Sequence, residues 1–425
     1  MMHRYDGGAN DSAEPDDAGT PSPVPFQKST GRVGLWLVGA RGSVATTATL
    51  GLAAIAGGHT TATGCVTASG PLADAPLPGF DEIVVGGHDV TDVSMVTRAE
   101  TLVHDGMVNS HVMEATRGAI ARADAEVRPG YTTMLPAGMP PESQQAAAER
   151  LAKDMSSFRD AHQLDHVVVV DLTSTEAVPE PAPEFFDDAA LRTALADPAR
   201  KVLPPSSVTA YAAILARAPY ACFTPSAGMN LPVLMEWATE AGIPVAGQDG
   251  KTGQTWLRTV LAPAFAARGL KVLSWAGANL LGGGDGATLA DPVTVQSKLA
   301  SKTRGLQSLT GSDVTPLHID NVPDLGNTKI AWDHVHVEGF LGSRLTLQTT
   351  WSAYDSMLAA PMVLDLARLL SLAARSGHAG PVSALGFFFK DPWSSDTHDF
   401  AGQTRELAEW VEEASRRVES NAQHS

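Results

Sequence analysis

The stretch RVGLWLVGARGSVATTATLGLAAI, residues 32–55, decides the fold class of this 425-residue chain. An apolar run of strand length leads into a turn that contains Gly39 and Gly42, and an Ala-, Thr- and Leu-rich helical segment follows. Strand, glycine turn and helix in this order are typical of a nucleotide-binding unit, because glycine lets a pyrophosphate approach the backbone at the helix N-terminus. Arg41 stands where the usual G-x-G-x-x-G pattern has its middle glycine, so the turn alone is weak evidence.

The segments after this turn alternate between apolar strands and helices. We expect strands within DEIVVGGHDV (81–90), DHVVVVDLTSTE (165–176), YACFTPS (220–226) and IPVAGQD (243–249), and helices at about 94–123, 206–218 and 231–242. This alternation predicts an α/β fold with a doubly wound parallel sheet of the Rossmann type. Asp89, just past the second strand, could accept hydrogen bonds from an adenosine ribose, or it could be an ordinary loop acid.

The pattern changes after GQDGKTGQT (247–255). We expect a helix at 256–269, a glycine-rich loop at 277–289, short alternating strands such as SRLTLQTTWS (343–352), and a long apolar helix at 357–377. The sequence therefore predicts a dinucleotide-binding domain formed by residues 30–253 and 355–425. An inserted α+β domain for catalysis and oligomerisation, residues 254–354, interrupts it. Residues 1–29 are polar and rich in Pro, Gly and Asp, which predicts a disordered tail.

Composition and charge exclude several classes of protein. The formal net charge is −17 at pH 7 and no basic tract occurs, which argues against a nucleic-acid partner. Glycine or polar residues interrupt every apolar run before the roughly 18 residues of a membrane span. Cys65 and Cys222 are the only cysteines, and neither they nor the thirteen histidines show a metal-ligand spacing. We expect no metal site, no membrane partner and a reduced, cytoplasmic location.

The lysines are unevenly placed along the chain. Nine of the thirty basic residues are lysines, and six of those nine lie at or after Lys251. In VQSKLASKTRG (295–305), Lys298 and Lys302 would share one helix face, where like charges repel by roughly 0.2–0.5 kcal/mol. A solvated helix face would explain the spacing. Lysine, unlike arginine, can also lose its proton when it is desolvated, so the pair is a candidate for chemistry.

Two glycine-rich segments are candidate ligand loops. GQDGKTGQT packs Asp249, Lys251 and Thr252 among glycines, but it lacks the spacing of G-x-x-x-x-G-K-[ST], which excludes an NTPase. LLGGGDGATL places four glycines around Asp285. This second segment is either a flexible hairpin or a backbone that approaches a ligand, with a carboxylate for a hydroxyl or a cation.

Taken in order, these motifs resemble those of the myo-inositol-1-phosphate synthase (inositol-3-phosphate synthase) family, from about residue 32 to about residue 395. The turn LVGARGSVATT resembles the family's LxGxGGNNGxT, GGHDV its GWDI, GQDGKTGQT its GDDxKSGQT, and SWAGANLLGGGDGATL its SxNHLGNNDGxNL. QSKLASKT resembles RSKEISKS, NVPDLGNTKIAWD resembles YVPYxGDSKxAxDE, and YDSMLAAPMVLDL resembles CEDSLLAAPIILDL. Seven motifs in one order are far more specific than any one of them.

The resemblance implies NAD as cofactor, a small sugar phosphate as substrate and a homotetramer. It places catalytic groups at Lys298, Lys302, Lys329, Lys390, Asp249 and Asp355. It places cofactor-binding groups at Gly39, Ala40, Arg41, Gly42, Ser43, Val44, Asp89, Thr173, Ser174, Asp249, Thr252 and Asp285. An acid at the ribose favours NAD over NADP because it repels a 2′-phosphate, although Arg41 could pair with that phosphate.

The chain departs from the family pattern close to cofactor and substrate. Two family asparagines are Gly283 and Gly284, and the acid of GDSK is Asn327. In the first loop, two family glycines are replaced by Arg41 and Ala45, and both asparagines by Ser43 and Val44. These changes alter the groups close to cofactor and substrate, so they affect the expected identity of the substrate more than the expected fold.

The implied reaction is a redox-neutral conversion of D-glucose 6-phosphate to 1D-myo-inositol 3-phosphate, by oxidation at C5, enolisation, aldol closure and re-reduction. In it Lys329 or Lys302 moves the C5 hydroxyl proton, Lys298 and Lys302 stabilise the enolate and the C1 oxyanion, and Lys390 holds phosphate or assists at C1. Asp249 would orient Lys329 or a cation. The alternatives are an NAD-dependent dehydrogenase or cyclase acting on a different sugar phosphate, and a non-catalytic NAD-binding homologue.

Overall fold

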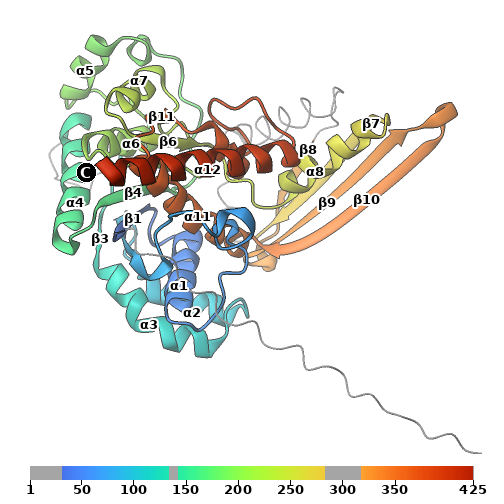
Figure 1. Ribbon diagram of the computed structural model, residues 1–425, viewed down its shortest axis with the longest axis horizontal. Helices are drawn as coiled ribbons and strands as arrows, with labels where there is room; N and C mark the ends of the chain where they lie inside the picture. Colours follow the sequence, from blue (N-terminus) through green and yellow to red (C-terminus); the bar gives the residue numbers. More distant parts are fainter. Residues whose placement is uncertain (1–30, 134–141, 283–316, 425) are drawn as a thin grey trace, which may run out of the picture.

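Two β-sheets organise the chain in the computed structural model, which describes residues 31–133, 142–282 and 317–424 (Figure 1). The strands are β1 (Val33–Val38), β2 (Ile83–Asp89), β3 (Val127–Pro129), β4 (His166–Asp171), β5 (Tyr220–Cys222), β6 (Pro244–Gly247), β7 (Lys271–Leu281), β8 (Leu317–Asn321), β9 (Thr328–Glu338), β10 (Arg344–Tyr354) and β11 (Gly380–Pro381). The helices are α1 (Ser43–Ala56), α2 (Met95–His104), α3 (Ser110–Ala125), α4 (Gln144–His162), α5 (Asp188–Ala196), α6 (Pro205–Leu215), α7 (Pro232–Glu240), α8 (Gln254–Ala267), α11 (Asp355–Arg375) and α12 (Phe400–His424).

The first sheet has seven strands in the order β11-β6-β5-β4-β1-β2-β3, and all its pairings are parallel. β1 lies between β2 and β4, and its last residue, Val38, is in register with His88 and Asp171. The chain moves outward from β1 in both directions, so the ends of β1 and β4 flank the point where the strand order reverses. The predicted doubly wound α/β fold is confirmed.

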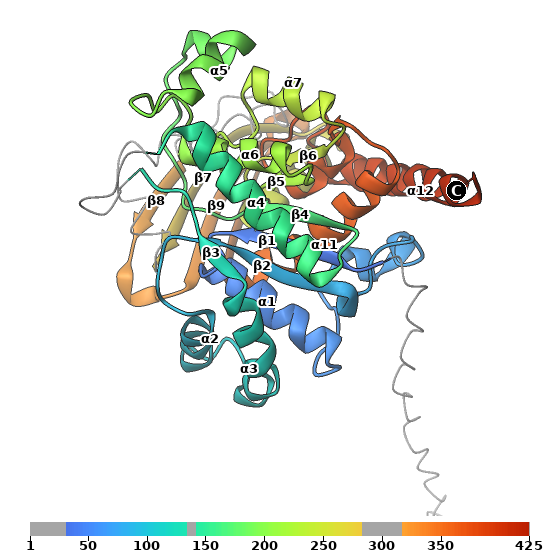
Figure 2. The ribbon, with the colours of Figure 1, turned by 90° about the vertical axis from the view of Figure 1, so that its left-hand side faces the viewer.

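Strand residues alternate between two hydrophobic cores, one on each face of this sheet. Leu35 and Leu37 of β1 face the core that contains α1, α3 and α11, whereas Trp36 and Val38 face the core that contains α4, α6 and α7. Figure 2 shows α1 and α4 on opposite sides of β1 and β2. Burial on both faces explains why these strands are continuous apolar runs.

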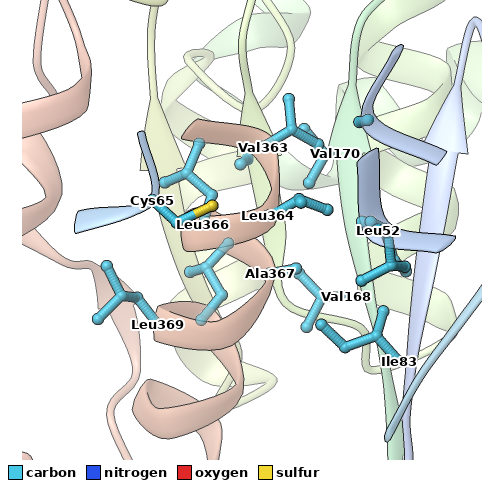
Figure 3. Packing of buried hydrophobic residues seen from close by; sticks show 14 of the residues in the cluster. Leu52, Cys65, Ile83, Val168, Val170, Val363, Leu364, Leu366, Ala367 and Leu369 are labelled. Atoms are coloured by element: carbon cyan, nitrogen blue, oxygen red, sulfur yellow. The ribbon is translucent and has the colours of Figure 1, made fainter. Parts of the chain in front are cut away.

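Helix α11 is the central helix of the first core. Val363 and Ala367 of α11 lie beside Val170 and Val168 of β4 (Figure 3). The helix is long and apolar enough to cross a membrane by length and composition, but 72% of its most apolar window is buried inside the protein, as in a core helix.

Two buried polar residues tie α11 to the segment that follows α1. Asp365 accepts hydrogen bonds from the backbone N–H groups of Val66 (2.9 Å) and Thr67 (3.1 Å). Arg368 donates to the carbonyl oxygens of Thr67 and Pro78, at 3.0 and 2.8 Å. Each charge therefore has partners inside the fold, as buried charges require.

The second sheet has four strands in the order β10-β9-β7-β8, with antiparallel β10-β9-β7 and parallel β7-β8. Its long hairpin of β9 and β10 extends away from the parallel sheet (Figure 1). Helix α8 covers one face, where Trp275, Val335 and Val337 are buried against Ala262.

Two predicted segments differ from the structure. The helical stretch expected at 94–123 is two helices, because Gly106 has a left-handed φ of +73° and the Asn109 side chain caps α3 by accepting from the His111 N–H. The loop expected at 277–289 begins later, since residues 277–281 belong to β7 and pair with both β8 and β9. Asp89 is the last residue of β2.

Candidate active site

The turn after β1 forms an open cradle at the N-terminus of α1. Gly39 has φ +78°, and a Cβ atom there would lie 3.1 Å from the Leu172 carbonyl oxygen, so the turn requires glycine. A Cβ on Gly42 would lie 3.0 Å from the Gly39 carbonyl oxygen. In the described part of the chain no side chain caps α1 and its first turn has no acid. Free N–H groups and the positive end of the helix dipole fit the pyrophosphate of a dinucleotide.

Asp89 and Arg41 shape the rim of this cradle. Asp89 Oδ2 accepts from the backbone N–H of Arg41 at 2.7 Å, while Oδ1 accepts from the N–H groups of Val90 and Thr91 at 2.7 and 2.8 Å. The Arg41 guanidinium points to other partners: Nε donates to Asp124 Oδ1 at 2.8 Å and Nη1 donates to the Thr91 carbonyl oxygen at 2.7 Å. Asp89 thus holds the turn in place beside the predicted ribose position.

The other predicted cofactor residues lie around the same turn. Ala40 is fully buried and donates its N–H to the His88 carbonyl oxygen at 3.1 Å. Val44 packs partly against the core, whereas Ser43 and Ser174 are exposed. Thr173 donates its hydroxyl to Asp171 Oδ1 at 2.6 Å.

Asp171, at the end of β4, is a buried acid that the sequence did not single out. Besides Thr173, it accepts from the Tyr220 hydroxyl at 3.0 Å. Burial raises the pKa of the Asp171 carboxyl, and hydrogen bonds from Thr173 and Tyr220 oppose that shift. These two hydrogen bonds to Asp171 fix the start of the loop that carries Thr173 and Ser174.

The loop after β6 brings Asp249 to Lys390. Lys390 Nζ donates to Asp249 Oδ1 at 2.7 Å, and the Lys390 backbone N–H donates to the Asp249 carbonyl oxygen at 2.7 Å. The two side chains are 8% and 5% exposed. Asp249 has a left-handed φ of +63°, which is uncommon for a residue with a side chain. The sequence predicted that Asp249 orients Lys329 or a cation; in the structure its carboxylate accepts from Lys390.

Lys329 pairs with Asp355, which is the first residue of α11. Lys329 Nζ donates to Asp355 Oδ1 at 3.2 Å, and the hydroxyl of Thr252 donates to the same oxygen at 3.0 Å. Strand β10 brings the two side chains together. Its residue Ala353 pairs with Lys329 of β9, and Asp355 follows two residues later, at the start of α11. The carboxylate therefore joins the second sheet to the loop after β6.

Close packing fixes the loop that carries Asp249 and Thr252. A Cβ on Gly250 would lie 2.4 Å from the Phe223 ring, and one on Gly253 would lie 2.4 Å from the Trp351 ring. The backbone N–H groups of Asp249 and Gly250 donate to the carbonyl oxygens of Thr224 and Phe223, just after β5. The loop thus lies at the carboxyl edge of the parallel sheet, the edge that also carries Gly39.

Lys251 is a further lysine of this loop that was not predicted as a site residue. It is 5% exposed, and its Nζ donates to Gln403 Oε1 on α12. Burial lowers the pKa of the Lys251 ammonium to about 7. Two sequence signals pointed to it: its position among the late lysines and its place in the candidate ligand loop GQDGKTGQT.

Three predicted site residues, Lys298, Lys302 and Asp285, lie outside the described residues. The structure therefore brings together Lys329, Asp355 and Thr252 as one group and Lys390 and Asp249 as a second, both contacting the segment 247–253. Two ammonium groups held by carboxylates can donate to a developing oxyanion or exchange protons with a hydroxyl.

Comparisons with known proteins identify the family of the chain. The family model described as myo-inositol-1-phosphate synthase matches residues 33–412. Inositol-3-phosphate synthase 1 of Bacteroides thetaiotaomicron is 31% identical over an alignment of 404 residues, which covers 89% of this chain and 92% of that protein. A probable inositol 3-phosphate synthase isozyme of Arabidopsis thaliana is 27% identical over 71% of this chain, and the match spans 61% of the plant protein.

Two solved structures share the fold. The inositol-3-phosphate synthase of Caenorhabditis elegans superposes with a TM-score of 0.78 at 22% identity, over 91% of this chain and 86% of that one. A myo-inositol-1-phosphate synthase-related protein of Thermotoga maritima gives 0.72 at 23% identity, over 89% and 98%. The glycine cradle, the paired lysines and the match of the family model over residues 33–412 lead to one conclusion: the chain belongs to the myo-inositol-1-phosphate synthase family.

Proposed function

We propose that this chain converts D-glucose 6-phosphate to 1D-myo-inositol 3-phosphate in an NAD-dependent, redox-neutral cyclisation. The observation that carries the proposal is the pairing of Lys329 with Asp355 and of Lys390 with Asp249 around one loop, in a chain of this family. The relative from Bacteroides, with which the chain shares 31% identity, bears the name of the same activity.

NAD fits the residues present at the carboxyl edge of the parallel sheet. The turn at Gly39 and Gly42 would hold the pyrophosphate on the N–H groups of α1, and Asp89 would lie at the adenosine ribose. When bound, NAD supplies the acceptor and the donor of a hydride. We expect NAD to bind more tightly than NADP, because the Asp89 carboxylate repels a 2′-phosphate.

Lys329 is proposed to exchange the proton of the C5 hydroxyl. Its side chain is 8% exposed and its ammonium is bonded to the carboxylate of Asp355, so the ammonium is held in one orientation and can donate or take up a proton at Nζ. The hydroxyl of Thr252 shares the Asp355 oxygen, which limits the movement of the carboxylate. A preorganised donor of this kind stabilises an alkoxide without rearrangement.

Lys390 is proposed to hold the phosphate or to assist at C1. Its charge is matched by Asp249, and its backbone is bonded to the same residue, so the side chain is fixed at both ends. Lys298 and Lys302 are proposed to stabilise the enolate and the C1 oxyanion. That role is supported by the resemblance of QSKLASKT to the family motif.

We also propose the domain division and the assembly that the sequence predicts. Residues 30–253 and 355–425 would form one domain, and residues 254–354 an insertion in it. The strand content of the sheets supports this division, because β1–β6 and β11 form the first sheet and β7–β10 form the second. A homotetramer formed through the inserted sheets is supported by the face of β9 opposite α8, where Trp332 is 39% exposed. A cytoplasmic location is supported by Cys65 and Cys222, which are buried free thiols.

Incubation of the NAD-loaded protein with D-glucose 6-phosphate, followed by phosphorus NMR and NADH absorbance, tests the activity. We expect the phosphorus signal of an inositol monophosphate to replace that of the substrate, with no steady accumulation of NADH. Product formation with stoichiometric NADH would indicate a sugar-phosphate dehydrogenase instead. NAD binding by calorimetry without turnover of the sugar phosphate would indicate a non-catalytic homologue.

A further inference from the structure

Arg41 occupies a place in the cofactor cradle that is not explained by pyrophosphate binding. It stands between Ala40 and Gly42, and its backbone N–H is bonded to Asp89, the acid proposed to lie at the adenosine ribose. A guanidinium beside that ribose is the group that accommodates the 2′-phosphate of NADP in many dinucleotide-binding folds. Asp89 therefore favours NAD, whereas Arg41, whose backbone is bonded to Asp89, favours NADP.

The contacts of the guanidinium resolve this conflict. Arg41 Nε donates to Asp124 Oδ1 at 2.8 Å, and Arg41 Nη1 donates to the Thr91 carbonyl oxygen at 2.7 Å. Arg41 and Asp124 are 20% and 18% exposed, so the pair is partly shielded from water. The positive charge is thus matched by a carboxylate of the protein, and two of its three nitrogens are engaged.

Asp124 is itself fixed by the surrounding helices. It lies in the last turn of α3, and its Oδ1 also accepts from the backbone N–H of Met95, the first residue of α2, at 3.2 Å. A carboxylate with a charged partner and a backbone donor has little freedom to move away. Asp124 therefore keeps the Arg41 side chain against the loop that follows Asp89, where Arg41 also bonds Thr91.

We propose that Asp124 is a specificity-determining positioning residue, which holds and neutralises Arg41 and thereby preserves the selectivity for NAD over NADP. The inference rests on the proposed use of NAD. A 2′-phosphate could recruit Arg41 only by breaking its guanidinium contacts with Asp124 and Thr91. It would also meet two carboxylates, that of Asp124 at the guanidinium and that of Asp89 at the Arg41 backbone. Removal of the Asp124 charge leaves Arg41 available for bidentate binding of phosphate.

The test is calorimetric titration of NAD-free protein with NAD and with NADP. We expect Asp124→Asn to strengthen NADP binding at least about tenfold relative to NAD, because an ion pair near a protein surface is replaced by one with the ligand. The asparagine oxygen can still accept from the Met95 N–H and from Arg41 Nε, so α2 retains its contact and only the negative charge beside Arg41 is lost. The double variant Asp124→Asn with Arg41→Met should return the NADP-to-NAD ratio to that of the unsubstituted protein.

The matched control is Asp160→Asn, which makes the same charge change at an exposed pair with Arg159 on α4 and should leave both affinities unchanged. The proposal is overturned if Asp124→Asn changes both affinities by the same factor or neither. It is also overturned if the unsubstituted protein prefers NADP and loses that preference in Arg41→Met. Because the readout is a binding ratio, a failure of the proposed cyclisation would leave these results intact and would be recognised separately.

Discussion

Replacement of Lys329 by arginine is expected to be a severe change. The lysine is 7% exposed and its Nζ reaches Asp355 at 3.2 Å, in a space that also contains the Thr252 hydroxyl. Arginine is bulkier and keeps its proton, so it can neither fit this geometry nor transfer a proton. We expect Lys329→Arg to bind NAD normally and to lose at least about a hundredfold in turnover, the typical cost of a lost oxyanion donor.

Steady-state kinetics with D-glucose 6-phosphate, together with calorimetry for NAD, check this expectation. The control is Lys271→Arg, an exposed lysine at the start of β7 in the same inserted sheet, which should keep full turnover. Near-normal turnover of Lys329→Arg would remove Lys329 from the proposed chemistry.

Lys251 predicts a specific dependence of stability on pH. Burial lowers its pKa in the folded protein from 10.5 to about 7. Between these values the unfolded chain binds more protons than the folded protein, so stability should rise with pH, with a slope of up to about 1.4 kcal/mol per pH unit from this group. In Lys251→Met that contribution is absent, and the variant should be more stable than the unsubstituted protein at pH 7 by an amount that shrinks toward pH 10.

Urea unfolding at several pH values from 7 to 10 measures the difference between the two proteins. Lys271→Met, at an exposed position, should follow the unsubstituted protein throughout. Parallel stability curves for Lys251→Met and the unsubstituted protein would show that the Lys251 ammonium keeps its proton equally well in both states.

At the scale of elements, a buried ion pair fixes α8 on the second sheet. Arg258 Nη2 donates to Asp333 Oδ1 at 2.5 Å, and Gln254 and Trp275 donate to the same carboxylate, each at 2.8 Å. Both charged side chains are at most 5% exposed. Removal of one partner leaves an uncompensated buried charge, so we expect Arg258→Met alone to cost about 3–5 kcal/mol of unfolding free energy.

A double-mutant cycle isolates the interaction. Asp333→Asn combined with Arg258→Met should cost less than the sum of the single changes by at least about 1 kcal/mol, because no charge is then left unpaired. The exposed pair Arg344 and Glu338 on the same sheet, 50% and 34% exposed, should show a coupling below about 1 kcal/mol. Additive costs at Arg258 and Asp333 would mean that water replaces the lost partner.

The same network bears on why the first five residues of one predicted loop, 277–281, belong to a strand. Gly277 was assigned to a glycine-rich loop, but a Cβ there would lie 2.7 Å from Arg258 Nη2 and 2.9 Å from Asp333 Oδ1. This glycine allows close packing against a buried ion pair, and a local pattern contains no information on that distant contact. The strand, turn and helix at 32–55 were predictable because their signals are local. The short edge strands β3 and β11 have three and two residues, too few for a periodic pattern.

At the scale of the whole molecule, the site joins segments that are far apart in the chain. Lys390 and Asp249 are separated by 141 residues, and Lys329 and Asp355 by 26. Spacing alone could not pair them, and the family resemblance indicated only that they share a pocket. The pairing of Asp249 with Lys390, rather than with Lys329, depends on the course of the loops after β6 and before α12, which only the three-dimensional fold determines.

The proposed tetramer gives the last prediction. On β9, Val335 and Val337 point toward α8, and the alternate residues Trp332, His334 and His336 point to the opposite face of the sheet. Trp332 is 39% exposed there, on a hairpin that extends away from the parallel sheet (Figure 1). A large aromatic side chain of this kind is typical of the centre of an interface, where a charge would be desolvated.

We expect the unsubstituted protein to be a tetramer at micromolar concentration by light scattering, and Trp332→Arg to form smaller species. The control is Phe186→Arg, an apolar-to-charged change at a side chain that is 70% exposed, near the start of α5 and away from the inserted sheet. That variant should remain tetrameric. Because Lys329 lies three residues from Trp332 on the same strand, dissociation should also lower turnover if neighbouring sheets keep β9 in place. A tetramer that survives Trp332→Arg with unchanged mass would exclude this face from the interface, whereas a monomeric unsubstituted protein would exclude the assembly itself.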